Sequence, residues 1–442
     1  MPRVIFIHPC IGRSEGDTYV RSWQMQPLGI ATLAALTPDS WDRTFYDDRL
    51  ETIDYEQDAD LVAISVETYT ARRAYQIARR FRDRGIPVVL GGYHPTLCPD
   101  DAMQHADAIC VGEAESVWET ILADTLAGTL KPRYDATPTA LDGPAPDRSV
   151  FDGKNYFKLA MVETGRGCPM GCTFCSIAAF FGPTYRRRAT ADIVEELESL
   201  KERTVFFVDD NIVADPRSAR ELFEAIIPLN IRWISQASVN VTRDPELLDL
   251  MKRSGCMGLL VGFESLDDDL LRATGKTINR STDYSQALKE FRKRGIVIYS
   301  TFLFGLEGDS PELMDRETEF CIRETTFLSG FNHVVPFPGT PLYDELQREG
   351  RLTSDAWWLD EDYRFGMLAF EPRDMSSKEL EARCHAARKQ FYSLGSILRR
   401  SLDWRANTRS IGRMLTFWAT NLMMRRELTS KSGRPLGVEG ES

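Results

Sequence analysis

The chain has 442 residues, which is enough for two or three domains at about 150 residues per domain. Its hydrophobic fraction of 43% and charged fraction of 27% are typical of a globular protein, and its net charge of −12 argues against nucleic acid as the main partner, since phosphate contacts need a basic surface. No run reaches the ~18 apolar residues of a membrane span, no secretory signal begins the chain, and the scattered thiols indicate a reducing cytoplasm and no disulfide framework.

Short β-rich runs alternate with apolar-periodic helical patterns in the first third of the chain. This alternation predicts a parallel, doubly wound, Rossmann-like sheet of the flavodoxin type. Such sheets bind ligands beyond the carboxyl ends of their strands. The expected strands are residues 4–7, 43–46, 60–65, 87–91 and 108–111, and the expected helices are residues 27–36, 71–84 and 114–127.

Polar residues and glycines follow these expected strands. A glycine pair such as Gly91-Gly92 allows the backbone to approach a bulky ligand closely. We expect His94 either to bond such a ligand or to be satisfied by its own turn, and Glu113 either to contact the ligand or to begin a helix, where the dipole favours a carboxylate. The candidate ligand contacts are Ser65, Glu67, Gly91, Gly92, His94, Gly112 and Glu113.

Residues 131–155 form the expected linker between two domains. The segment contains Pro132, Pro138, Pro144 and Pro146 among polar residues, a composition that disfavours both a helix and a central strand. We expect the linker to pack over the surface and to hold a first domain, residues 1–130, above the second, residues 156–345.

The middle of the chain repeats a strand–helix pattern six times, which predicts a partial (β/α)6 barrel with its active site at the carboxyl ends of the strands. Thr190 is the expected N-cap of a helix over residues 191–203. Gly275-Lys276-Thr277 is similar to a phosphate-binding loop, but Leu270 stands where that motif needs glycine, so we expect a turn. The expected strands are residues 159–164, 205–209, 232–237, 258–263, 297–304 and 332–336.

Three of the nine cysteines, Cys168, Cys172 and Cys175, lie close together on a glycine-containing stretch. Thiolates at this spacing can point at one centre. Three of them suit an iron–sulfur cluster that leaves one iron open, since a closed cluster takes four. A zinc site with a distant fourth ligand is the alternative, although paired cysteines are the more usual zinc spacing.

The spacing C-x3-C-x2-C, with Phe174 just before the last cysteine, resembles the signature of the radical S-adenosylmethionine (SAM) superfamily. In that family the open iron of a 4Fe–4S cluster binds SAM, and the reduced cluster splits SAM to a 5′-deoxyadenosyl radical that removes a hydrogen atom from the substrate. The resemblance implies that Phe174 lies beside the adenine. It further implies SAM contacts at the ends of the barrel strands, namely Asp209, Asp210, Ser238 and Glu264.

The first third, with its turn Gln26-Pro27-Leu28-Gly29 and the cysteine trio downstream, resembles the cobalamin-binding domain that precedes many radical SAM enzymes. Many cobalamin domains carry D-x-H-x-x-G, whose histidine ligates cobalt, whereas the corresponding region here reads Asp47-Asp48-Arg49-Leu50-Glu51-Thr52. This departure resembles the branch that binds the cofactor without a protein histidine, and it leaves open that the domain has lost cobalamin.

After Leu342 the chain is expected to be helical, so residues 346–442 form a C-terminal extension that includes the aromatic pair Trp357-Trp358. From Arg388 the charge turns basic around an apolar stretch, which predicts either a helix on a membrane surface or an ordinary packed helix. A membrane contact would favour a lipophilic substrate. The last dozen residues are expected to be disordered.

The resemblance implies a cytoplasmic, cobalamin-dependent radical SAM enzyme that methylates an unactivated carbon of a lipid or small natural product, with flavodoxin or ferredoxin as electron donor. The chain is similar in length and layout to the enzymes that act on hopanoids and tetrapyrroles. A radical cyclase or coupling enzyme without methyl transfer and a non-catalytic cobalamin sensor are the alternatives. A methylthiolase acting on tRNA is disfavoured, because Cys110 falls inside an expected strand and supplies no second cluster. No residue stands out as an acid or base.

Overall fold

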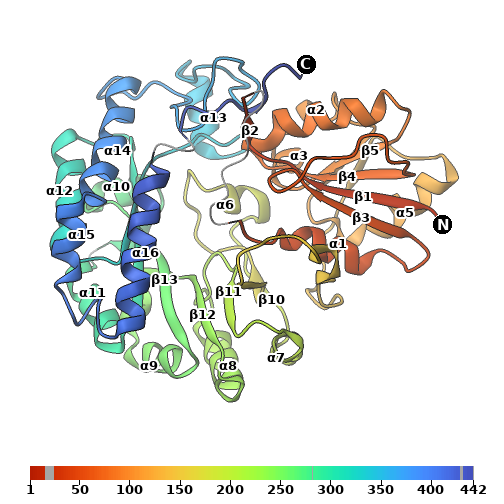
Figure 1. Cartoon of the computed structure of the whole chain (residues 1–442). Coiled ribbons are helices and arrows are strands. Elements are labelled where there is room, and N and C mark those ends of the chain that lie inside the picture. The colour runs from red at the N-terminus through yellow and green to blue at the C-terminus, as the bar shows by residue number, and fades with distance from the viewer. Residues whose placement is uncertain (15–23, 281, 429–431, 442) are drawn as a thin grey trace.

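The computed structural model describes residues 1–14, 24–280, 282–428 and 432–441. Two six-stranded sheets, each with helices packed on it, make up the two lobes of the molecule (Figure 1). The first sheet has the order β3-β1-β4-β5-β6-β7, and all its strand pairs are parallel. Its strands are β1 (Arg3–His8), β3 (Asp42–Asp47), β4 (Leu61–Ser65), β5 (Val88–Gly91), β6 (Ala108–Val111) and β7 (Arg133–Asp135).

Helices cover both faces of the first sheet, as the doubly wound prediction requires. Alternate residues of β1 enter different cores because successive side chains of a strand point to opposite faces. Phe6 packs in one core with helices α1 (Leu28–Leu36) and α5 (Trp118–Ala127). Ile7 packs in the other core with α2 (Ala71–Arg82).

The segment expected to be a linker contributes to the first sheet. β7 forms the sheet edge beside β6, and its central residue Tyr134 is buried and donates a hydrogen bond of 2.8 Å to Asp124 Oδ2. Pro132 does not interrupt the sheet because it precedes β7 at the edge, a place where proline is tolerated. Farther along, Phe151 is buried in the core beneath α1.

The second sheet has the order β15-β14-β13-β12-β11-β8 and is also parallel throughout, so the partial barrel is confirmed. The sixth strand covers Leu328–His333, earlier than the predicted residues 332–336, because Pro336 cannot donate to a sheet. The other strands are β8 (Ala160–Val162), β11 (Thr204–Phe207), β12 (Arg232–Gln236), β13 (Cys256–Glu264) and β14 (Val297–Phe304).

The helices of the second lobe pack on its sheet in one continuous hydrophobic core. Helix α7 (Thr190–Ser199) begins at Thr190 itself and its N-cap is Ala189, so the predicted capping role of Thr190 is wrong. The other helices are α8 (Pro216–Ile226), α9 (Pro245–Arg253), α10 (Asp268–Ala273), α11 (Tyr284–Arg294), α12 (Pro311–Arg323) and α13 (Pro341–Arg348).

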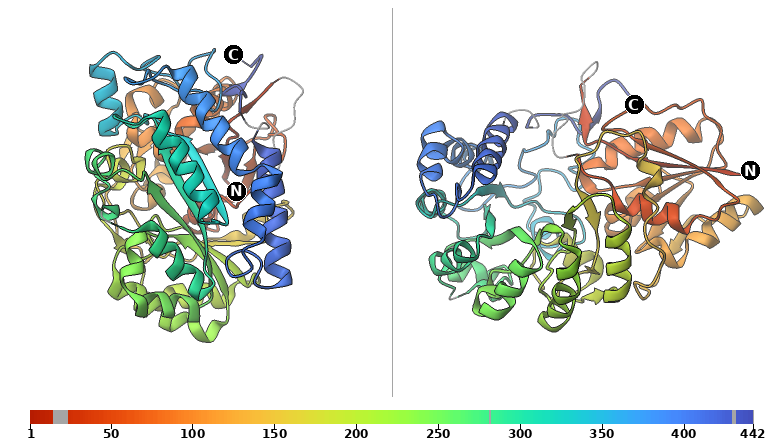
Figure 2. Two further views of the ribbon diagram at one scale, coloured as in Figure 1. Left: turned by 90° about the vertical axis from the view of Figure 1, so that its left-hand side faces the viewer. Right: turned by 60° about the horizontal axis from the view of Figure 1, so that its bottom comes forward.

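The C-terminal extension adds α14 (Ser377–Phe391), α15 (Leu394–Ser401) and α16 (Ile411–Glu427) beside the open edge of the barrel (Figure 2). Arg400 of α15 is fully buried and donates to the carbonyls of Thr326, Phe327 and Phe391, which ties this layer to the barrel. None of the described helices combines the length and apolarity needed to span a membrane.

The chain returns to the first lobe at its end, so the disorder expected for the last dozen residues is wrong for residues 432–441. Strand β16 (Gly437–Val438) pairs in parallel with β2 (Gly12–Arg13). The Gln76 side chain donates to the carbonyl of Val438 at 3.0 Å, and Glu441 pairs with Arg73 at 2.5 Å. These contacts hold the tail against α2.

Candidate active site

The three clustered cysteines lie on one loop between β9 (Gly165–Arg166) and the short helix α6 (Ser176–Phe181), at the junction of the two lobes (Figure 1). The Cys175 N–H donates to the Cys172 carbonyl at 3.2 Å, which turns the loop back on itself. Burial raises the pKa of Cys172 to about 11, and the nearby Lys276 ammonium opposes that shift. All three thiols are unpaired.

The cysteine loop docks on the turn after α10. The Thr173 N–H donates to the Thr274 carbonyl at 3.0 Å. Gly275 has a φ of +76°, and a Cβ there would lie 2.7 Å from the Gly171 carbonyl oxygen. A residue with a side chain therefore cannot take this place without moving the loop. The predicted turn at residues 275–277 is confirmed, and it supports the cysteines.

Lys276, which follows that glycine, reaches a carboxylate at the end of β13. Its Nζ lies 3.1 Å from Glu264 Oε1, and their side chains are 18% and 8% exposed. Burial disfavours the charged form of Lys276, but the Glu264 carboxylate and the Cys172 thiol raise its pKa above the ordinary value. The ammonium therefore stays charged between the thiols and Glu264.

Glu264 adopts a strained backbone conformation with a φ of +63°, which is rare for a residue with a side chain. Two neighbours hold it there. Asn279 Nδ2 donates to the carbonyls of Gly262 and Phe263 at 2.8 and 3.1 Å, and the Tyr284 hydroxyl also donates to Phe263 at 3.1 Å. In this conformation the Glu264 carboxylate pairs with Lys276.

The other predicted SAM contacts follow β11 and β12. Asp209 is 1% exposed, and both its oxygens accept hydrogen bonds from Thr164, so this carboxylate ties β8 to β11. Burial raises the pKa of Asp210 to about 6. The Asp210 carboxylate in turn helps to raise the pKa of Cys168 and of Tyr93. The Ser238 N–H donates to Asn211 Oδ1 at 3.1 Å.

A cavity of about 370 Å³ lies over the carboxyl ends of the strands of the first sheet and reaches α6, the helix that follows the cysteine loop. It brings together six of the seven predicted ligand contacts in the first lobe: Ser65, Glu67, Gly91, Gly92, Gly112 and Glu113. His94 is not among its lining residues. It is fully buried behind the cavity, where Nε2 lies 3.0 Å from the Tyr75 hydroxyl and 3.1 Å from Asp101 Oδ2.

Gly92 shapes the floor of this cavity. Its φ is +101°, and a Cβ there would lie 2.9 Å from the Val66 carbonyl oxygen, so glycine is required. Tyr93 begins the next short helix, α3 (Tyr93–Leu97), and its ring lies 4.7 Å from that of Phe180 on α6. Both rings line the cavity where it meets α6, the helix that follows the cysteine loop.

Arg166, which precedes the cysteines, joins the two lobes. Its guanidinium pairs with Glu113 at 2.5 Å, Glu115 at 2.6 Å and Glu163 at 2.9 Å. Glu113 also pairs with Arg186. Burial disfavours the charge, but Glu163 and its neighbours hold the pKa of Arg166 above the ordinary value. Arg166 is therefore part of the interface between the lobes.

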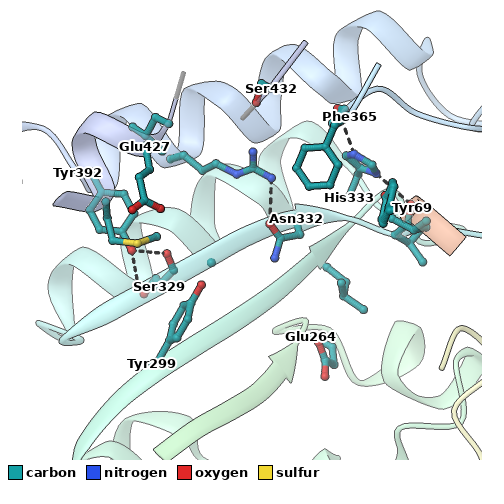
Figure 3. Close-up of a pocket in the computed structure, with 18 of the residues that line it drawn as sticks. Tyr69, Glu264, Tyr299, Ser329, Asn332, His333, Phe365, Tyr392, Glu427 and Ser432 are labelled. Atoms are coloured by element: carbon teal, nitrogen blue, oxygen red, sulfur yellow. Dashed lines mark hydrogen bonds between the residues drawn. The ribbon is translucent and has the colours of Figure 1, made fainter. Parts of the chain in front are cut away.

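A second cavity, of about 520 Å³, extends from Glu264 and Phe174 along the concave face of β14 and β15 (Figure 3). Tyr299 and Leu303 face it because alternate residues of β14 point inward. Its outer wall comes from α14 and α16, and Tyr69 reaches it from the first lobe. A molecule bound here would lie against the polar strand ends.

The chain was compared with known proteins. The model of the radical SAM superfamily matches residues 162–321, and that of the B12 binding domain matches residues 20–122. The chain is 31% identical to bacteriochlorophyllide d C-12(1)-methyltransferase of Chlorobaculum tepidum over 90% of this chain and 88% of the relative. It is 29% identical to hopanoid C-2 methylase of Rhodopseudomonas palustris over 80% and 71%, respectively.

A solved structure has the same fold. It is the radical SAM methyltransferase TsrM of Kitasatospora setae with cobalamin and a 4Fe–4S cluster bound, with a TM-score of 0.69 at 17% identity over 97% of this chain and 99% of that one. The likeness covers the first sheet, the partial barrel and the C-terminal helices together.

Proposed function

The chain belongs to the cobalamin-binding radical SAM enzymes, and we propose that it places a methyl group on an unactivated carbon of a lipid or small natural product. The observation that carries this proposal is the convergence of three features. The cysteine loop, the Glu264–Lys276 pair and the cavity along β14 meet at one end of the barrel, while the first-lobe cavity opens toward the same place.

The cofactors of this family are a 4Fe–4S cluster, SAM and cobalamin, and the residues present fit them. Cys168, Cys172 and Cys175 offer three thiols from one loop, the donor set of a cluster with one open iron. The glycine-floored cavity of about 370 Å³ fits part of a large planar cofactor. When bound, the cluster supplies the electron that cleaves SAM, and cobalamin carries the methyl group.

The chain's own residues are proposed to bind and orient SAM. We infer that Glu264, fixed by its strained backbone, accepts hydrogen bonds from SAM, while the Lys276 ammonium offsets the negative charge of the thiolates. Asp210, Ser238 and Phe174 complete the proposed SAM contacts. Asp209, whose oxygens accept hydrogen bonds from Thr164, is also a proposed SAM contact.

The first lobe orients cobalamin in this proposal. Ser65, Glu67, Gly91, Gly92 and Gly112 line the cavity beneath it, and Glu113 keeps the lobes aligned through Arg166. Tyr93 and Phe180 exclude water from the junction by packing their rings together. His94 supports the loop from behind through Tyr75 and Asp101.

The test is an oxygen-free incubation of the reconstituted protein with SAM, reductant and an extract of cells that lack the gene, followed by mass comparison. Methyl transfer predicts an extract component that gains one methylene unit and forms only with the enzyme. A product of unchanged or reduced mass would indicate cyclisation or rearrangement instead. A flavodoxin or ferredoxin is the proposed electron donor, and its replacement by a chemical reductant provides the comparison.

We also propose peripheral contact with an anionic membrane through the C-terminal helices. Large apolar side chains are exposed beside Arg399, Arg405 and Arg409, which are exposed too. This mixture suits the surface of a bilayer. The apolar residues are Leu394, Leu398, Leu402 and Trp404, at 55%, 53%, 74% and 62% exposure.

Sedimentation with vesicles tests this contact. The wild type is expected to bind phosphatidylglycerol vesicles and not phosphatidylcholine vesicles. Leu402→Asp with Trp404→Asp is expected to abolish binding. Leu126→Asp, at a residue 56% exposed on the first lobe, is the control that keeps it. Equal binding of all three proteins would overturn the proposal.

A further inference from the structure

The cavity along β14 ends in a group of hydrogen-bond donors that the reaction proposed above does not use. Tyr299 of β14 and Asn332 of β15 line it (Figure 3), and Arg388 of α14 is a further lining residue. Gly330 lies between the first two. A methyl group added at Gly330 would lie 3.1 Å from Tyr299 Oη and 3.4 Å from Asn332 Nδ2. The glycine therefore leaves a small space among the donors.

The Arg388 guanidinium is held in place by two neutral acceptors. Its Nε donates to the Phe331 carbonyl at 2.8 Å, and Nη2 donates to Asn332 Oδ1 at 2.9 Å. The second bond fixes the amide, since Oδ1 accepts from the arginine and Nδ2 is left on the side of Gly330. Arg388 and Asn332 thus present N–H groups to the same space.

Among the salt bridges of the described residues, none joins Arg388 to a carboxylate. The Glu427 carboxylate lines the same wall, and both its charge and that of Arg388 act on the Tyr299 hydroxyl. Burial raises the pKa of Tyr299, so its hydroxyl keeps its proton and can donate. A half-buried guanidinium beside two neutral donors is the arrangement that binds a carboxylate.

The rest of the cavity toward the reaction centre is largely apolar. Its walls include Tyr69, Phe174, Leu303, Phe337 and Phe365. We propose that the substrate is an amphipathic carboxylic acid, whose carboxylate lies among Arg388, Asn332 and Tyr299 and whose apolar body extends toward Glu264. One guanidinium with neutral donors suits the single charge of a carboxylate better than the double charge of a phosphate monoester.

The sheet register gives the scale of this substrate. Phe302 of β14 pairs with Glu264, and the next residue, Leu303, pairs with Asn332, so Asn332 lies two strands away from Glu264 at nearly the same level of the sheet. At about 4.8 Å between neighbouring strands, Asn332 and the Arg388 guanidinium bonded to it lie roughly 10 Å from Glu264 across the sheet. The reacting carbon of the substrate is thus expected on the order of 10 Å from its carboxylate. This inference rests on the proposed function only in assigning the cavity to the substrate.

Equilibrium dialysis of the anaerobic holoenzyme against pyrenebutyrate and its uncharged amide tests the proposal. The acid is expected to bind about tenfold more tightly than the amide, as expected for a charged hydrogen bond. Arg388→Gln is expected to remove this preference by weakening the acid alone, and Arg388→Lys to retain part of it. Unchanged iron and cobalamin contents show that both variants are folded.

Two further variants serve as controls. Arg383→Gln alters the same helix outside the cavity, where Arg383 pairs with Glu379, and is expected to bind both probes normally. Gly330→Ala is expected to weaken both probes equally by filling the space. Equal binding of acid and amide, acid binding insensitive to Arg388→Gln, or binding of neither probe would overturn the proposal. This binding assay does not measure methyl transfer. A failure of the proposed methylation can therefore be distinguished from a failure of the proposed carboxylate site.

Discussion

Lys276 Nζ and Glu264 Oε1 lie 3.1 Å apart beneath the cysteine loop and form a largely buried ion pair. Lys276 comes from the turn after α10, and Glu264 ends β13 in a strained conformation with a φ of +63°. The pair therefore joins the support of the cysteines to the strand end proposed to hold SAM.

Lys276→Met is expected to destabilise the cluster-free protein, because the largely buried Glu264 side chain would lose its partner. The expected loss of unfolding free energy is about 3 kcal/mol, the cost of breaking a buried pair. Denaturant titration measures it. Lys293→Met removes an exposed pair with Glu290 and is expected to cost less than about 1 kcal/mol. Equal losses in both variants would show that burial of the Lys276 pair has no effect.

Gly275→Ala is expected to reduce the iron and sulfide bound per chain after anaerobic reconstitution. The added methyl would lie 2.7 Å from the Gly171 carbonyl and push the cysteine loop away. Gly350→Ala is the control that separates the effect of the steric contact from the effect of backbone strain. Gly350 also has a positive φ, +66°, but a Cβ added there would have no atom within 4 Å. Normal iron in Gly275→Ala, or an equal loss in Gly350→Ala, would refute the role of this contact.

Gly92→Ala is expected to reduce cobalamin retention, measured from the corrin absorbance of the desalted protein. The new Cβ would lie 2.9 Å from the Val66 carbonyl and displace the loop that carries Tyr93. Gly85→Ala is the matched variant, with a φ of +78° and open space around it. The prediction fails if the two variants retain the same amount of cobalamin.

The cysteine trio can be read directly from the sequence, and the positions of most strands could be predicted because they depend on local periodicity. The role of Lys276 was not predicted: the sequence indicated only a turn at residues 275–277, and the contact of Lys276 with Glu264 arises from the packing of that turn against the cysteine loop. His94 follows a glycine pair at a strand end, yet the backbone turns its ring inward to Asp101.

The donor group in the substrate cavity was also invisible in the sequence. Arg388 begins a run of basic residues that predicted either a membrane-surface helix or an ordinary packed helix, and neither prediction contained its contact with Asn332 on β15. Arg400 of the same run is buried for the same reason, because α15 packs between α14 and α16. Such contacts between distant segments leave no periodic signal.

Glu317 is expected to make stability fall with rising pH. It is 1% exposed, and its Oε1 accepts hydrogen bonds from Ser265 and Leu266 at 2.7 and 2.8 Å. Burial raises the pKa of Glu317 from 4.5 to about 8, with those bonds opposing the shift. Between these values the folded chain binds more protons than the unfolded chain, so unfolding free energy decreases as pH rises.

Glu317→Gln removes this titration and is expected to flatten the dependence. Relative to the variant, the wild type should lose more than about 1 kcal/mol between about pH 5 and about pH 8, as each pKa unit corresponds to about 1.4 kcal/mol. Denaturant titrations at both pH values measure the difference. Glu319→Gln, at an exposed position on the same helix, is expected to parallel the wild type. A parallel curve for Glu317→Gln would contradict the prediction.

The most direct test of the whole account is metal analysis and SAM turnover of the oxygen-free protein beside a variant with alanine at Cys168, Cys172 and Cys175. The account predicts a 4Fe–4S cluster in the wild type, cleavage of SAM to 5′-deoxyadenosine, and transfer of a deuterated methyl group from labelled SAM to the product, all lost in the variant. Zinc in place of iron, or unchanged turnover in the variant, would contradict it.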